Sequence, residues 1–198
     1  MSLFAPASDT TLPLHVLSEE GLESWLSKQG ASVQGWVSAN GFTGGLGQAL
    51  VVPGDAGKPD MALAGYGSEA ARRRGRFHLA AAAAKLPKGD YQIASGLPQE
   101  QQAVEALGWL LSGYRFDRYR EQTALAARLV APEGVDAKQI TALAEGEMLT
   151  RDLINTPASD MGPPDLEAAA RKLAEQHGAK IEVTTGEALL ENNLPMIH

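Results

Sequence analysis

Imidazole and carboxylate side chains are the groups in this chain that could bind a metal ion or move a proton. The sequence has no cysteine, which excludes disulfides, thiolate metal sites and a cysteine nucleophile. No two histidines stand four residues apart, the spacing that puts two imidazoles on one helix face for zinc. We therefore assign none of the four to a metal site: His15, His78, His177 and His198.

The carboxylates are scattered along the chain rather than gathered in one segment. Glu19–Glu20, Asp117 and Glu145–Glu147 fall on expected helix faces and turns, where solvation is the usual role of an acidic residue. Asp152 and Asp160 flank an Asn-Thr-Pro turn, and capping and turn bonding explain an aspartate there. The sequence therefore predicts no catalytic, cofactor-binding or metal-binding residue in this chain.

A glycine-rich run at 41–47 is the one segment that could cradle a phosphate. It lacks the lysine and hydroxyl residue that end a P-loop, and its glycines do not match the dinucleotide fingerprint. Because glycine is the default residue where φ is positive, we expect a flexible turn between two strands instead.

Arginines form one dense run and one looser run, and both could face an anionic partner. The residues are Arg72, Arg73, Arg74 and Arg76, then Arg115, Arg118 and Arg120. DNA binding needs several basic contacts, whereas the chain has 24 acidic against 17 basic residues and a formal charge of −7. We expect these arginines to lie on a solvated surface or in a subunit contact, with DNA binding as a less favoured role.

Composition places the chain among ordinary globular proteins. Hydrophobic residues make up 44% of its 198 residues and charged residues 21%. The first residues lack a basic region followed by an apolar stretch, and the longest apolar run, 79–84, is too short for a membrane span. We expect a cytoplasmic protein that makes no contact with a membrane.

Strands and helices alternate along the first ~130 residues, which favours an α/β sheet flanked by helices. Apolar runs predict strands at 12–17, 33–38, 49–53, 61–64, 91–94, 123–130 and 180–184. Helical spacing and end signals predict helices at 19–29, 68–85, 98–111, 136–154, 163–177 and 187–192. Within this scheme Gly30 ends the first helix in the left-handed conformation, and Ser68 caps the second. Trp25, Trp36 and Trp109 stand among apolar residues, and we expect them in the core.

Two segments carry a resemblance to a known family. One is ALGWLLSGYRFDRY at 106–119, and the other is RDLINTPASDMGP at 151–163. Together they resemble the leucyl aminopeptidase (cytosol aminopeptidase) family of two-metal exopeptidases. The final segment, 187–198, also resembles the run that leads into that family's catalytic core. The likeness covers the second half of the chain well and the first ninety residues loosely.

The resemblance implies that the chain has three parts. Residues 1–135 form a macro-domain-like, non-catalytic α/β domain with a mixed sheet, and residues 136–156 form an interdomain linker helix. Residues 157–198 form the truncated start of a second α/β domain, which is the catalytic one. The family's metal ligands are a lysine, aspartates and a glutamate in glycine-rich segments, and no such segment is present here. We therefore expect this chain to be inactive alone.

By the same likeness, the intact enzyme removes amino-terminal residues such as leucine from peptides, uses two divalent ions (manganese or zinc) and forms hexamers. The alternative, from another class, is a free-standing macro-like module that binds DNA or a nucleotide such as ADP-ribose. The apolar residues of 163–198 suit a sheet that is mostly missing, so this segment should be mobile or buried against a neighbouring chain.

Overall fold

The computed structural model describes residues 3–198, and the chain divides into two compact units, Met1–Arg151 and Asp152–His198. The first unit contains a five-stranded sheet, and the second contains helices without a strand among the described residues. No helix in the described part of the chain combines the length and the apolar character needed to cross a membrane.

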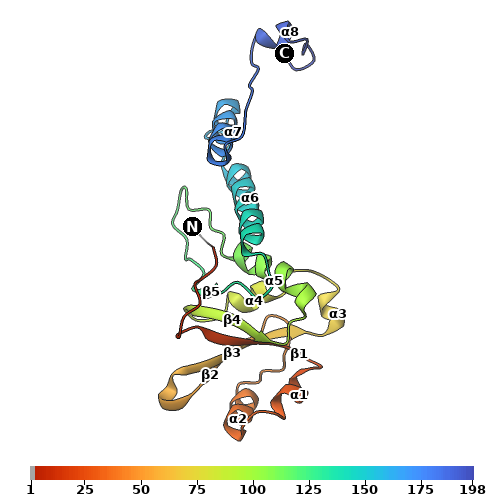
Figure 1. The fold of residues 1–198 in the computed structure, drawn as a ribbon, viewed down its shortest axis with the longest axis vertical. Coiled ribbons are helices and arrows are strands. Elements are labelled where there is room, and N and C mark those ends of the chain that lie inside the picture. The colour runs from red at the N-terminus through yellow and green to blue at the C-terminus, as the bar shows by residue number, and fades with distance from the viewer. Residues whose placement is uncertain (1–2) are drawn as a thin grey trace. The chain divides into compact units, whose positions relative to one another are not determined.

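The sheet of the first unit is mixed, as the family resemblance implies. Its strands are β1 (Leu12–Ser18), β2 (Ala49–Pro53), β3 (Pro59–Gly67), β4 (Gly89–Ser95) and β5 (Ala127–Leu129). Their order across the sheet is β2-β3-β1-β4-β5 (Figure 1). The β2–β3 hairpin is antiparallel, and the other neighbouring pairs are parallel. Helical crossovers join the parallel strands, because parallel neighbours cannot be joined by a tight turn.

Helices cover both faces of this sheet. The helices along this part of the chain are α1 (Leu22–Leu26), α2 (Ala31–Ala39), α3 (Glu69–Arg72), α4 (Leu79–Ala83), α5 (Gln99–Ser112) and α6 (Ala137–Asn155), with a short 3₁₀ turn at Asp55–Gly57. The second unit holds α7 (Pro163–His177) and α8 (Ala188–Glu191). Figure 1 shows α1 and α2 on one side of the sheet and α4 and α5 on the other.

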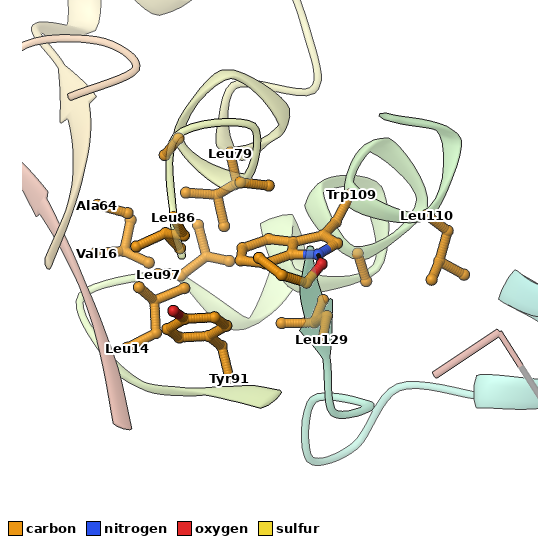
Figure 2. Packing of buried hydrophobic residues seen from close by; sticks show 14 of the residues in the cluster. Leu14, Val16, Ala64, Leu79, Leu86, Tyr91, Leu97, Trp109, Leu110 and Leu129 are labelled. Carbon is orange, nitrogen blue, oxygen red and sulfur yellow. Dashed lines mark hydrogen bonds between the residues drawn. The ribbon is translucent and has the colours of Figure 1, made fainter. Parts of the chain in front are cut away.

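Alternation along the strands divides the buried residues into two cores. Leu14 and Val16 of β1 belong to the larger core, which also includes residues of α4, α5 and α6, whereas Leu17 belongs to the smaller core beside α1 and α2. The same alternation in β3 sends Ala62 and Ala64 to one face and Leu63 to the other. The indole of Trp109 lies at the centre of the larger core, beside Tyr91 and Leu129 (Figure 2).

The three tryptophans have different environments. Trp109 is 1% exposed and its indole nitrogen donates to the carbonyl of Ala127 at 3.3 Å, which confirms a core role. Trp25 is partly buried against the smaller core. Trp36 is 41% exposed, so the expectation of core packing is wrong for it.

The predicted strand at 33–38 is wrong, because these residues belong to helix α2. Val33 and Val37 stand four residues apart and both pack on the smaller core, so the helical period describes this segment better than alternation. Gly30 has φ −65° and ψ 156°, an extended conformation that starts α2. It is not the left-handed end of the preceding helix.

The predicted helix at 68–85 is interrupted. Ser68 does cap its start, with the hydroxyl accepting from the Ala71 N–H at 3.3 Å, but α3 ends at Arg72. Phe77 then adopts φ +61°, a left-handed conformation that no helix interior accommodates, and α4 begins at Leu79.

The prediction of one continuous helix before the Asn-Thr-Pro turn is confirmed. Helix α6 runs for 19 residues through Gly146, with Ile140 and Ala144 buried. The predicted helix at 163–177 is confirmed too, and Gly178 ends it at φ +61°. No strand forms at 180–184, where the prediction is wrong. An isolated extended segment has no neighbour for its backbone groups, and the second unit supplies none among the described residues.

Candidate functional site

The most deeply buried charged side chain in the described chain is Glu105, which is 1% exposed. It belongs to α5, where Trp109 stands four residues further on the same buried face. One carboxylate oxygen accepts from the Tyr66 hydroxyl at 3.0 Å, and the other accepts from the Leu79 N–H at 2.9 Å. Since Leu79 is the first residue of α4, the carboxylate lies at the positive end of that helix.

Tyr66 completes this buried cluster from the end of β3. Burial raises the pKa of the Tyr66 phenol, the Glu105 carboxylate raises it further, and the Arg72 guanidinium opposes both. The phenol therefore keeps its proton and donates a hydrogen bond to the Glu105 carboxylate. The Arg72 guanidinium lies 4.8 Å from the centre of the Tyr66 ring and donates to the carbonyls of Tyr66 and Gly67 at 3.3 and 2.7 Å.

This cluster is closed rather than open to a substrate. Within residues 3–198, no buried side-chain nitrogen or oxygen lacks a hydrogen-bond partner. The Glu105 carboxylate thus ties β3, α4 and α5 together, and we assign it a structural role. Composition and motif spacing did not identify it. The signal that could have is a glutamate one helical turn before a core tryptophan.

The glycine-rich run 41–47 is a packed loop and not an open phosphate cradle. The side-chain oxygen of Gln48 accepts from the N–H groups of Thr43 and Gly45 at 2.9 and 3.0 Å. The Gly47 N–H donates to the Gly65 carbonyl at 3.0 Å. Gly44 has φ +75°, and a Cβ there would lie 2.7 Å from the Ser18 carbonyl oxygen. Glycine is thus needed for close backbone approach, and several N–H groups that a phosphate would use are already bonded.

The histidines do not come together in the structure. His15 of β1 has its Nδ1 2.8 Å from the Ser95 hydroxyl of β4, and its ring lies 5.2 Å from the Trp25 ring. Burial lowers the pKa of the His15 imidazole. His78 packs edge-on against Tyr66, and His177 lies in the last turn of α7. Each of these three histidines therefore has a local packing or helix-end environment of its own.

The carboxylates and histidines of residues 3–198 include no group of three that could hold a metal ion. Glu147 instead pairs with Arg151 one turn along α6. The donor set in the described chain therefore does not fit a two-metal centre.

Several of the arginines are used inside the fold. Arg72 donates to backbone carbonyls, and Arg115 donates to the carbonyls of Thr123, Ser112 and Tyr114 at 2.6, 3.0 and 2.6 Å. Arg73 pairs with Glu69 on the surface. Arg72 and Arg115 are therefore held within the fold, whereas the remaining arginines of the two runs are exposed: Arg73, Arg74, Arg76, Arg118 and Arg120.

A broad hollow of about 1270 Å³ lies in the first unit at the amino ends of the parallel strands. Its charged lining alternates in sign: Asp9, Lys58, Asp60, Lys88, Asp90 and Arg128. Arg128 and Asp90 bond to each other at 2.7 and 2.9 Å. Ligands of open α/β sheets bind at the carboxyl ends of strands, so this hollow lies at the opposite edge from the usual site.

Comparisons with known proteins agree on one family. A family model for the N-terminal domain of M17 aminopeptidases matches residues 12–132. The probable cytosol aminopeptidase of Streptomyces coelicolor is 31% identical over 160 residues, which cover 65% of this chain and 29% of that protein. The probable cytosol aminopeptidase of Caulobacter vibrioides is 28% identical over 202 residues, covering 90% of this chain and 41% of that protein.

Solved structures show the same fold. The cytosol aminopeptidase from Coxiella burnetii superposes with a TM-score of 0.83 at 29% identity, over 93% of this chain and 40% of that chain. The bottromycin maturation enzyme BotP in complex with Mn superposes with a TM-score of 0.65 at 25% identity, over the same shares. The chain spans less than half the length of each of these four proteins. None of these matches supports a free-standing module for DNA or ADP-ribose.

Proposed function

Because the chain belongs to the M17 aminopeptidase family, we propose that it serves as the N-terminal, non-catalytic part of an enzyme that removes amino-terminal residues from peptides. The observation that supports this most directly is the match of residues 12–132 to the N-terminal domain of that family. This range contains the whole sheet, from the start of β1 to the end of β5. The proposal assigns no catalytic residue to the chain.

The proposed division of labour has three parts. Residues 1–135 form the non-catalytic sheet domain, 136–156 form a linker helix, and 157–198 form the beginning of the catalytic domain. The unbroken run of α6, from Ala137 to Asn155, supports the linker because a continuous helix fixes the separation of its two ends. The absence of any buried residue in α7 supports the third part, because an amphipathic helix gains its stability from a face that it packs against.

The metal chemistry belongs, in this proposal, to the part of the enzyme that the chain does not match. Two divalent ions, manganese or zinc, would polarise the scissile carbonyl and activate a water. The described residues contain no group of ligands suited to them. We further propose that the intact enzyme is cytoplasmic and hexameric, and that this domain controls access and assembly.

A chimera tests the proposal. The matching region of the Coxiella burnetii cytosol aminopeptidase is replaced by this chain, and hydrolysis of leucine p-nitroanilide is measured with manganese or zinc. We expect the chimera to hydrolyse the substrate and this chain alone to show no turnover. Metal-dependent hydrolysis by this chain alone, retained through a second purification, would contradict the non-catalytic role. A folded but inactive chimera would contradict the proposed correspondence of the two domains.

A further inference from the structure

The outer edge of β2 pairs with no other strand of the sheet, so it could pair with a strand of another chain. β2 is the last strand on its side of the sheet, and its sequence, Ala-Leu-Val-Val-Pro, carries no charge (Figure 1). An uncharged edge strand presents unpaired N–H and C=O groups, which are a template for pairing with another chain. Nothing in the function proposed above requires this edge to be open or closed.

Trp36 of α2 occupies this edge. Its indole nitrogen donates to the Val51 carbonyl at 3.0 Å, although the side chain remains 41% exposed. In an antiparallel strand the N–H and C=O of one residue point the same way, and residues two apart share that direction. The bond to Trp36 therefore identifies Ala49, Val51 and Pro53 as the residues whose backbone groups point outward.

Two further features block the same edge. Pro53 has no N–H, so the last outward position of β2 offers no donor. A hollow of about 270 Å³ is lined by Ala49 and Leu50 together with Asn40 and Lys85. Asn40 follows α2 on one face of the sheet and Lys85 follows α4 on the other, so this hollow adjoins the first residues of β2. A lysine at such an edge opposes pairing because a second strand would bury its charge.

We infer that Trp36 guards the edge of β2 against pairing with the β2 strand of a second copy of this chain. The indole takes the outward carbonyl in the middle of the strand, Pro53 removes a donor at one end, and Lys85 places a charge beside the other. Assembly of the protein must then use surfaces other than this edge. The inference rests on the fold alone and does not depend on the proposed function.

The test compares self-association by sedimentation velocity across a range of protein concentrations. Trp36→Phe keeps an aromatic ring and removes the indole donor, so we expect its self-association to be at least tenfold tighter than that of the wild type. Trp36→His restores a ring N–H and should associate less than Trp36→Phe. Trp25→Phe, which changes a tryptophan of α1 away from the edge, should match the wild type.

A second substitution identifies the surface that pairs. Ala49→Pro removes an outward N–H from β2, so it should return the Trp36→Phe variant to the wild-type mass. A folded Trp36→Phe variant with wild-type association overturns the inference. Association that Ala49→Pro fails to reverse overturns it too, because pairing would then occur elsewhere. If Trp36→Phe does not fold, the test uses Lys85→Leu in the wild-type background, which should increase self-association. No increase would contradict the inference that this edge is protected against pairing.

Discussion

The Glu105 carboxylate and the Tyr66 hydroxyl lie 3.0 Å apart across the interface between α5 and β3, and both side chains are buried. The second carboxylate oxygen accepts from the first N–H of α4 at 2.9 Å. A single side chain thus satisfies a strand residue and a helix terminus that are 39 and 26 residues away in sequence. A buried charge with one hydrogen bond would be costly, whereas two donors and the helix end compensate for its lost hydration.

The first prediction concerns this pair. Glu105→Ala should lower the free energy of unfolding by about 2–4 kcal/mol, because two buried donors lose their acceptor and a cavity opens. Tyr66→Phe removes one hydrogen bond to a charged acceptor and should cost about 1.5–3 kcal/mol. Urea unfolding of the two single variants and the double variant measures the coupling. Strictly additive losses would show that the two side chains do not act together.

The prediction of the fold from sequence succeeded where local signals and tertiary packing agree. The hairpin of β2 and β3 follows from two apolar runs around a dense set of turn residues, and α6 follows from its apolar stripe and the proline after it. A strand was wrongly predicted at 33–38 because the short apolar pattern of this segment fits a strand and a helix equally. The packing of Val33 and Val37 on the smaller core decides in favour of the helix.

Long-range bonds explain what the sequence could not show. The interruption of the helix predicted at 68–85 depends on Phe77, which packs against Gly108 of a later helix, and on the cap from Glu105. Neither partner is near in sequence. The strand predicted at 180–184 fails for the opposite reason, since a β-prone segment stays irregular when no strand is beside it.

The second prediction concerns pH. Burial lowers the pKa of His15, so between that lowered value and ~6.5 the unfolded chain binds more protons at this residue than the folded chain does. The contribution of His15 to stability is therefore complete above ~6.5 and falls as the pH drops toward the folded-state pKa. Urea unfolding at several pH values measures how far the free energy of unfolding falls as the pH is lowered. We expect this fall to be smaller for His15→Gln than for the wild type. Equal acid losses, or an imidazole that titrates above ~6.5 by NMR, would contradict it.

The third prediction concerns the second unit. Leu166 and Leu173 of α7 are 53% and 41% exposed, so Leu166→Glu and Leu173→Glu should change the stability of this chain by no more than about 0.5 kcal/mol. In an enzyme where other residues pack against α7, each substitution would bury a charge. The loss of unfolding free energy there should be several-fold larger than in this chain. Thermal unfolding of both forms measures the difference. A large loss in this chain would mean that α7 is already packed against something.

The last prediction uses two helical glycines with opposite surroundings. Apart from the adjoining backbone of α6 itself, no heavy atom lies within 4 Å of the position that a Cβ would occupy on Gly146. Gly108 of α5 has the Phe77 Cβ at 2.4 Å from that position and two Phe77 ring atoms at 2.8 Å. Alanine is favoured over glycine in a helix by about 0.8–1 kcal/mol, and this gain is the same in principle at both sites.

Sterics must therefore decide the sign. Gly146→Ala should raise the free energy of unfolding by about 0.5–1 kcal/mol, because only the helix preference changes. Gly108→Ala should lower it by about 1–3 kcal/mol, since Phe77 is held by its own backbone at φ +61° and overpacking outweighs the preference. Urea unfolding of both variants gives the two values side by side. Equal stabilisation at the two sites would show that Phe77 moves aside freely, and the strained turn before α4 would then not be fixed by α5.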